Sequence, residues 1–541
     1  MTAATERRVS SIVLRTLLSA SSPPAMATAS TLIDDPELAD ATAYWLTQGG
    51  DTRLQLDVQG TNLYGCPPRP DPGLIALGSS TASVVSARGF EAASRLMLRL
   101  GADPGCWPGE VDRVRAELLA LTGADQVTGT QVVLAASGTD LHLIATQILS
   151  PADGEPGAAR PLQALMADPS ETGSGVPKAL AARHFNTVTA QGAQVAPGLS
   201  LPGLEMAPAR TVALREPDGR PRPVEAIDAE FAAEAERIVR AGGRCLLVMV
   251  DVSKTGLVAP SPACALRLRH RWGEQVEVLV DACQFRLAPE SVAAFLRQDF
   301  LVALTGSKFV GGPAFSGALL LPPAAAARVR RRPLHRLRSY SARGDWPRSW
   351  PGARELPGSP NPGLLLRWEA ALAELRRLRE VPAAAVQDFL REWGAAASAR
   401  LTDDPVFEPL PVTPLAQSRD WRVASAGPAC WDRLPTILPF LPRRREGRTW
   451  RPLRPEETAW LHRQMREAQA GDGVPLLAQL RFQIGQPVVC GVRDGQALTA
   501  LRLCVGARDI SAATSGARGP AEALTQARLA LDKLAWLIGR I

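Results

Sequence analysis

The sequence predicts an α/β protein with a mostly parallel sheet, because short apolar runs alternate with helix-like stretches between residues 130 and 320. These runs are almost continuously apolar, as expected for strands that helices cover on both faces. Polar residues follow the runs directly, and ligands collect where the carboxyl ends of parallel strands meet. We therefore expect a covered sheet with a binding site along one edge.

The elements of this region follow one another in a regular order. Strands are predicted at residues 131–136, 245–250, 276–280, 300–304 and 317–321. Helices are predicted at residues 141–149 and 291–297, each after a strand and a short turn. The last strand begins so soon after its predecessor that we expect it to return antiparallel, which makes the sheet mixed.

The pattern changes after Pro322. Residues 328–348 are strongly basic, contain Pro333 and Pro347, and are predicted to form a connection. An α+β region follows, with strands predicted at residues 436–440, 480–484 and 500–505 and helices at residues 364–379, 456–468 and 521–538.

We expect three parts in the chain. A disordered tail is predicted at residues 1–30 and a large domain at residues 31–340. The N-terminal part of the large domain is expected either to cover the active site or to join the small domain. Residues 341–541 are predicted to form a linker and a smaller C-terminal α+β domain.

Composition narrows the classes of protein. The formal charge of +7 over 541 residues is modest, and the basic runs at residues 328–338 and 443–445 lack interleaved aromatic residues, so we predict no nucleic-acid partner. The eight cysteines form no CxxC pair and the five histidines no ligand cluster, which predicts neither disulfides nor a metal site. A reducing, cytoplasmic compartment fits these thiols. No apolar stretch is long enough to span a bilayer, so no membrane partner is expected.

Lys308 is the first candidate catalytic residue. It follows an apolar strand and the turn Thr305-Gly306-Ser307, and it precedes a glycine-rich exit. An ammonium there loses hydration, and a desolvated lysine releases its proton readily and forms Schiff bases. The alternative is a lysine that extends to the surface at a strand end.

Two further strand ends carry polar groups. The turn Ser137-Gly138-Thr139-Asp140 places N–H groups and hydroxyls at a helix start, which suits a phosphate, although a simple N-cap explains the same residues. Thr305 and Ser307 offer hydroxyls to the same anion. Asp281 ends a very apolar strand and needs a cationic partner, either a protonated ring nitrogen or an arginine such as Arg286.

Arg502 lies inside the apolar strand Leu501-Arg502-Leu503-Cys504-Val505. A guanidinium in that place suggests a bidentate clamp for a carboxylate. An outward-facing residue on an alternating strand explains it equally well.

The combination resembles a known family. Asp281-Ala282-Cys283-Gln284, then Lys308 27 residues after the aspartate, then Gly311-Gly312-Pro313 and a Gly317-Ala318 strand resemble the class V aminotransferases. These are pyridoxal-phosphate enzymes of fold type I and include the cysteine desulfurases. The resemblance extends over about residues 130–320 and, more weakly, 355–510.

The resemblance implies a role for each candidate residue. Lys308 is implied as the Schiff-base lysine, Asp281 as the partner of the pyridine nitrogen and Gln284 as the partner of the ring hydroxyl. The phosphate ligands would be Ser137, Gly138, Thr139, Thr305 and Ser307. Thr172 would occupy the position that often stacks on the ring, and Ser253 would face the ring. Arg502 would hold the substrate α-carboxylate. In a homodimer with shared sites, Ser359 would reach the phosphate of the neighbouring subunit.

Cys430 superficially resembles a desulfurase cysteine, since it ends the run Gly427-Pro428-Ala429-Cys430. The strand predicted directly after it leaves no place for such a loop, and the expected loop position, residues 483–487, has no cysteine. We interpret Cys430 as an ordinary buried thiol. The predicted function is a class V aminotransferase that acts on an amino acid. The alternatives are a pyridoxal-phosphate lyase, such as a cysteine desulfurase or selenocysteine lyase, and a degenerate binding protein.

Overall fold

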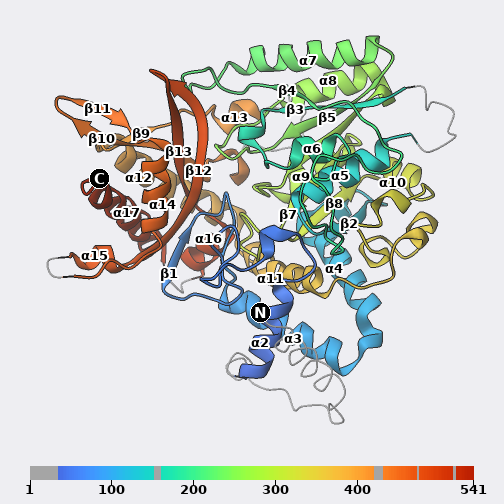
Figure 1. Cartoon of the computed structure of the whole chain (residues 1–541), viewed down its shortest axis with the longest axis horizontal. Helices are drawn as coiled ribbons and strands as arrows, with labels where there is room; N and C mark the ends of the chain where they lie inside the picture. Colours follow the sequence, from blue (N-terminus) through green and yellow to red (C-terminus); the bar gives the residue numbers. More distant parts are fainter. Residues whose placement is uncertain (1–34, 152–159, 420–429, 472–473, 516–518) are drawn as a thin grey trace.

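The computed structural model describes residues 35–151, 160–419, 430–471, 474–515 and 519–541. The predicted tail at residues 1–30 lies outside the described residues. Two sheets and their helices make up the molecule (Figure 1).

The first sheet contains the strands that the sequence predicted between residues 130 and 320. Its strands are β2 (Gln131–Ala135), β3 (Leu162–Ala167), β4 (Arg210–Val212), β5 (Arg244–Val250), β6 (Val276–Ala282), β7 (Leu301–Thr305) and β8 (Gly317–Leu321), in the spatial order β2-β8-β7-β6-β5-β3-β4. The predicted antiparallel return is confirmed, because β8 runs antiparallel to both β7 and β2. All other neighbours are parallel. Strands β2 and β7 therefore run in the same direction and end at the same edge.

Helices cover both faces of this sheet, which explains the continuously apolar strands. Along β6, Val278 and Val280 point into one core and Leu279 into the other. The helices of the first core include α2 (Pro36–Leu46), α3 (Ala87–Ala102), α4 (Trp107–Thr122), α7 (Val224–Arg240), α8 (Pro262–Trp272), α9 (Pro289–Arg297) and α11 (Pro362–Arg379), and this core continues into helices of the C-terminal part of the chain. Those of the second core are α5 (Gly138–Leu149), α6 (Val176–Leu180) and α10 (Pro323–Val329).

The second sheet joins distant parts of the chain. Its main path is β1 (Leu74–Leu77), β12 (Arg481–Arg493), β13 (Gln496–Cys504), β10 (Ile437–Glu446) and β11 (Thr449–Pro452), and β9 (Phe407–Pro409) pairs with β10. Strand β1 pairs in parallel with β12, which ties the N-terminal segment to this sheet. The accompanying helices are α12 (Ala383–Asp403), α13 (Leu415–Ser418), α14 (Pro455–Gln464), α15 (Leu476–Gln479), α16 (Ala507–Thr514) and α17 (Gly519–Ile538). A domain boundary near residue 340 stays a prediction.

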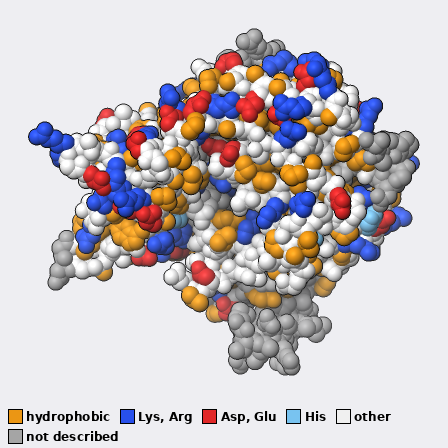
Figure 2. Space-filling model, turned by 45° about the horizontal axis from the view of Figure 1, so that its top comes forward, with side chains coloured by type: hydrophobic (Ala, Val, Ile, Leu, Met, Phe, Trp, Pro, Cys, Tyr) orange, Lys and Arg blue, Asp and Glu red, His pale blue; other side chains and the backbone are white. Residues whose placement is uncertain are grey.

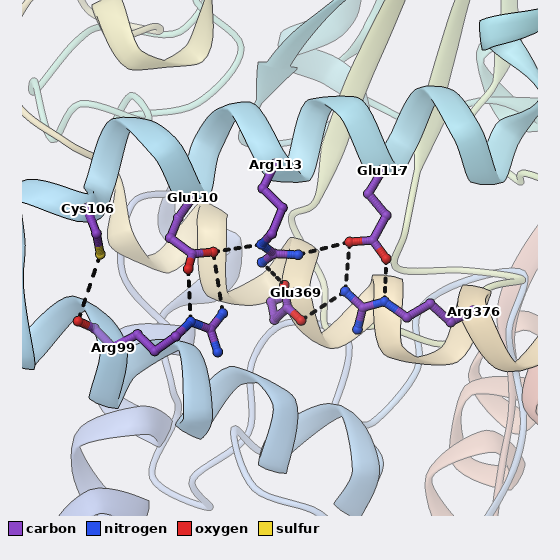
Figure 3. A network of polar contacts seen from close by, with 7 residues as sticks. All are labelled: Arg99, Cys106, Glu110, Arg113, Glu117, Glu369 and Arg376. Carbon is purple, nitrogen blue, oxygen red and sulfur yellow. Dashed lines mark hydrogen bonds and ion pairs between the residues drawn. The ribbon is translucent and has the colours of Figure 1, made fainter. Parts of the chain in front are cut away.

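A chain of ion pairs joins α3, α4 and α11 (Figure 3). The Glu369 carboxylate on α11 accepts hydrogen bonds from Arg113 on α4 and from Arg376. Arg376 lies two turns further along α11, at 3.1 Å from Glu369. Glu117 on α4 binds the same two arginines, and the Arg113–Glu117 distance is 2.9 Å. The Glu369 side chain is only 7% exposed, so its charge depends on these partners.

We expect Glu369→Ala to lower the free energy of unfolding by about 2–3 kcal/mol, because two guanidinium groups lose a buried partner. Denaturant titration followed by circular dichroism measures this change. The control is Arg99→Ala at the exposed end of the same network, where the pair with Glu110 is expected to contribute less than about 1 kcal/mol. Equal losses for the two variants would contradict a special role for the buried carboxylate.

Other properties concern the chain as a whole. None of the helices in the described ranges combines the length and apolar character that a bilayer span needs. All eight cysteines are free thiols. On the face shown in Figure 2, basic and acidic side chains are interspersed rather than gathered in one stripe.

Candidate functional site

The candidate site is a cavity of about 290 Å³ at the carboxyl ends of β2, β5, β6 and β7, closed by β13 and the N-terminal segment. Eleven of the twelve predicted site residues line it: Ser137, Gly138, Thr139, Thr172, Ser253, Asp281, Gln284, Thr305, Ser307, Lys308 and Arg502. They converge because β2, β5, β6 and β7 all end at one edge of the sheet. The exception, Ser359, is exposed and does not line the cavity of its own chain. Its predicted contact with a neighbouring subunit stays a prediction.

One wall is the start of α5. Ser137 is the N-cap, and its hydroxyl accepts from the Asp140 N–H at 3.3 Å. A Cβ on Gly138 would lie 2.8 Å from the Cys283 sulfur, so only glycine lets the turn approach that strand end. Thr305 donates to the Cys283 carbonyl at 2.6 Å, which holds the ends of β6 and β7 together. The N-terminus of a helix and the flanking hydroxyls suit an anion.

Arg53, which sequence reasoning missed, lies over this turn. It belongs to the short helix η1 (Thr52–Leu54) and forms an ion pair with Asp51 at 2.6 Å. Its guanidinium donates to the Ser137 hydroxyl at 3.1 Å and to the Thr139 hydroxyl at 3.3 Å. A cation beside the start of α5 strengthens the case for an anion site. The sequence near Arg53 carries no signal for this role, because the contact depends on a fold over a separation of 84 residues.

Asp281 at the end of β6 faces His142 of α5, and their Oδ2–Nε2 distance is 3.3 Å. The other imidazole nitrogen, Nδ1, lies 2.7 Å from the Gly138 carbonyl, which only accepts, so Nδ1 carries a hydrogen. Burial disfavours the charged form of each group, but the attraction between the two groups outweighs it. Asp281 therefore raises the pKa of His142, and His142 lowers the pKa of Asp281. Asp281 is therefore held ionised, and His142 keeps its second proton to a higher pH than a free imidazole does. Sequence reasoning did not single out His142.

Arg286, the alternative partner proposed for Asp281, points elsewhere. Its guanidinium donates to the Val505 carbonyl at 3.0 Å and to the Ser79 hydroxyl at 2.9 Å. It ties β6 to the second sheet, and the cavity face of Asp281 keeps room for a further cation.

Lys308 enters the cavity from the turn after β7. Among the described residues, no carboxylate pairs with its ammonium, and no hydrogen bond from it is found. Burial lowers the pKa of Lys308, with further lowering by Arg286 and Arg502, against Cys283 and Asp281 which raise it. The amine is therefore easier to deprotonate, as a nucleophile or a base requires.

Arg502 is 1% exposed, so the outward-facing interpretation is wrong. It crosses directly over Gly485 of β12, where a Cβ would lie 2.6 Å from its Nε. Nη2 donates to the Thr81 hydroxyl at 2.8 Å, and the buried Nε has no partner among the described residues. Burial lowers the pKa of Arg502, and within the described ranges no carboxylate neutralises it. Such a group fits a carboxylate ligand.

Three further predicted residues line the cavity, and the structure shows what their polar groups contact within the chain. Thr172 is buried and its hydroxyl has no partner among the described residues. The Ser253 hydroxyl donates to Glu171 at 2.7 Å, and the Gln284 amide donates to the Ser80 carbonyl at 2.9 Å. Their contacts with a cofactor ring stay predictions.

Cys430 lies outside the cavity, directly before the short helix η9 (Trp431–Arg433). It is partly exposed rather than fully buried. Burial and then Asp432 raise its pKa to about 12, so the sulfur stays protonated at neutral pH. The run that precedes it, residues 425–429, lies outside the described residues.

No family model matches the sequence, and no curated protein does. Several solved structures resemble the fold. A structure of the cystine C–S lyase C-DES with cysteine persulfide has a TM-score of 0.49 and 17% identity, and the match covers 84% of this chain and 97% of that one. The pyridoxamine–pyruvate aminotransferase of Mesorhizobium loti has a TM-score of 0.50, 15% identity, and coverage of 86% and 93%. The alanine–glyoxylate aminotransferase of a Nostoc species has a TM-score of 0.50, 14% identity, and coverage of 86% and 97%.

Identities this low show the fold alone. The large mixed sheet with helices on both faces, followed by the second sheet, is the architecture that those two aminotransferases share. The chain has the fold type I architecture of the pyridoxal-phosphate-dependent transferases.

Proposed function

We propose that the chain binds pyridoxal 5'-phosphate and acts on an amino acid through Lys308, as an aminotransferase of the class V type. The observation that carries the proposal is the Lys308 amine, which has no side-chain partner in the described part of the chain and lies in a cavity lined also by the start of α5 and by Asp281. The fold shared with two aminotransferases supports it.

The residues present fit this cofactor. The start of α5 with Ser137, Thr139 and Arg53 suits its phosphate. Asp281 offers a carboxylate to a protonated ring nitrogen, and Lys308 offers an amine to the aldehyde. Two buried polar atoms without partners among the described residues, Thr172 Oγ1 and Arg502 Nε, line the same cavity. Such atoms are costly unless a ligand binds them.

When bound, the cofactor supplies an electron sink for the carbanion that forms at the substrate Cα. Asp281 keeps the ring nitrogen protonated, because His142 holds its carboxylate ionised. Arg502 orients the substrate by its α-carboxylate. Lys308 Nζ then removes the Cα proton, as its lowered pKa allows.

A persulfide-forming lyase requires a thiolate near the substrate. Cys430 lies outside the cavity with a pKa of about 12, and Cys283, the cavity thiol, has a pKa raised by burial and by Asp281. These observations favour an aminotransferase over a desulfurase. A degenerate binding protein would keep the cofactor but release no keto acid from any amino acid.

Reductive trapping tests the proposal directly. Sodium borohydride treatment of the cofactor-loaded protein should fix a pyridoxyl group on the peptide that contains Lys308, as read by mass spectrometry. Lys178, which is exposed on α6, is the internal control and should stay unmodified. Absence of a label, or a label on Lys254 instead, would overturn the assignment.

We expect Arg53→Ala to raise the dissociation constant of the cofactor about tenfold or more, because a charge-assisted hydrogen bond contributes about 1.5–3 kcal/mol. Equilibrium dialysis with absorbance detection measures the constant. Arg69→Ala is the control, since Arg69 pairs with Asp40 on the surface. An unchanged constant in Arg53→Ala would remove Arg53 from the phosphate site.

A homodimer with shared sites and a cytoplasmic location belong to the same proposal. The exposed Ser359 supports the first and the eight free thiols the second. Sedimentation velocity of the protein is expected to give twice the chain mass, and Ser359→Ala is expected to weaken cofactor binding in the dimer.

A further inference from the structure

Lysine is rare in this chain, and its positions are informative. Only four of the 61 basic residues are lysines, and two of them, Lys254 and Lys308, line the same cavity. Lys178 is exposed, and Lys533 donates to three backbone carbonyls. Lysine supplies a compact ammonium where arginine supplies a planar fork. The presence of a second lysine, Lys254, in the cavity of Lys308 therefore calls for a functional explanation.

The backbone holds Lys254 next to Arg502. Lys254 comes two residues after Val252, whose φ of +61° is strained for a β-branched residue. The Lys254 N–H donates to the Glu171 carbonyl at 2.9 Å. Its carbonyl accepts from Arg502 Nη1 at 3.5 Å. These contacts fix the backbone, and the Lys254 side chain lines the same cavity as Arg502, near enough for that guanidinium to lower the pKa of its ammonium.

The charges of the cavity wall do not balance. Among the ionised groups that line it, Glu171 pairs with Arg215 at 3.1 Å and Asp281 with His142. Arg53 pairs with Asp51. In the described part of the chain, no carboxylate pairs with the Lys254 ammonium.

If Lys308 carries the cofactor, Lys254 and Arg502 remain as two cations with no ion-paired carboxylate among the described residues, because Glu171, the carboxylate that acts on both, is already paired with Arg215. One α-carboxylate satisfies only Arg502, whose fork can take both oxygens. A partly buried ammonium beside it stays uncompensated unless a second anion arrives.

We propose that the substrate is an amino acid with a carboxylate at the end of its side chain, and that Lys254 binds this second carboxylate while Arg502 binds the first. The inference rests on the proposed function and adds the substrate class to it. Lys254 is then a specificity-determining residue.

The pKa of Lys254 gives the pH range of the effect. Burial lowers it to about 8, with Arg502 and Lys308 as the neighbouring cations and Glu171 and Asp168 as the opposing carboxylates. As pH rises through this value the free ammonium loses its charge. We expect the preference for an acidic over a neutral side chain to fall above about pH 8. A ratio of acid to amide cancels the titration of Lys308, which acts on both substrates.

The test compares aspartate with asparagine and glutamate with glutamine, pairs that differ by a charge at nearly constant shape. Dissociation constants come from absorbance titration of the cofactor-loaded protein. The wild type should prefer the acid by about tenfold or more, the scale of a charge-assisted hydrogen bond. Lys254→Gln should abolish the preference and leave amide binding within about twofold. Lys178→Gln, at the surface, should keep it.

Three outcomes would overturn the inference: no preference in the wild type, a preference that survives Lys254→Gln, or equal weakening of acids and amides in that variant. Failure of the proposed function looks different, since the protein would take up no cofactor. In that case calorimetric titration of the purified protein with glutarate and with its monoamide still tests whether the cavity binds a second carboxylate. Equal affinities for the two would reject a second carboxylate site.

Discussion

Lys308→Ala is expected to lower kcat/KM for any amino acid substrate by at least about 10⁴-fold, because one amine both carries the cofactor and moves the Cα proton. No other amine in the described residues is placed to substitute fully, since Lys254 lies beside Arg502 rather than in the turn after β7. The visible absorbance of the covalently held cofactor should also disappear. Steady-state kinetics and an absorbance spectrum give the two readouts.

The controls separate chemistry from folding. Lys308 contributes little to the core, so the variant should unfold at the wild-type denaturant midpoint. Methylamine added to Lys308→Ala should restore part of the rate, because a small amine supplies the missing base. Lys178→Ala should match the wild type in every assay. A Lys308→Ala protein within tenfold of the wild type would refute the central role of this residue.

The part of the site that the sequence predicted shares one property: each residue directly follows a predicted strand. Ser137 and Lys308 come after β2 and β7, Asp281 is the next-to-last residue of β6, and the parallel geometry of the sheet brings such positions together. Local sequence and a general rule of sheet topology sufficed for these residues. Arg502 needed the structure, since only its burial over Gly485 separated the clamp from an outward-facing arginine.

The residues that were missed depend on contacts across the fold. Arg53 reaches the start of α5 from a short helix whose local sequence has no functional signature. His142 lies within α5 and looks like a core residue until the register of α5 against β6 places it beside Asp281. Lys254 follows a strained turn that no propensity scale predicts. Sequence periodicity predicts which side chains are buried, but it does not predict which buried polar groups contact one another in the fold.

Some elements of the fold were predicted from the sequence and others were missed. Five strands of the first sheet were recognisable because covering both faces forces continuous apolar runs, whereas β3 and β4 at its other edge were not predicted. Helix α7 was left out, although its buried residues Ile227, Phe231 and Ala235 recur at helical spacing. The parallel pairing of β1 with β12 was beyond local reasoning, since Leu74 and Arg481 are far apart in the chain.

Asp281→Asn is the second substitution with a large expected effect. The amide keeps the shape of the side chain but removes the charge that would hold a proton on the cofactor ring nitrogen. Loss of such a buried charge contact costs about 3–5 kcal/mol, which corresponds to a decrease in kcat of about 10²–10⁴-fold. KM should change much less, because Arg502 and the α5 wall still bind their groups. Steady-state kinetics separates the two constants.

The same variant should also change the pKa of His142, a change that a merely structural role for Asp281 would not produce. In the wild type the carboxylate raises the pKa of His142, so the imidazolium persists above its usual range and is lost as pH rises through the raised value. With asparagine in place, burial and Lys308 lower the pKa of His142 and only the hydrogen bond to the Gly138 carbonyl raises it, so we expect this pKa to fall. Nitrogen NMR of labelled histidine resolves this shift. His142→Gln keeps the Asp281 carboxylate but removes one of the groups that hold it ionised, so it should cost only about tenfold in kcat, because the histidine acts through the carboxylate. Equal losses in the two variants would mean that the pair, rather than the Asp281 charge, is what the reaction requires.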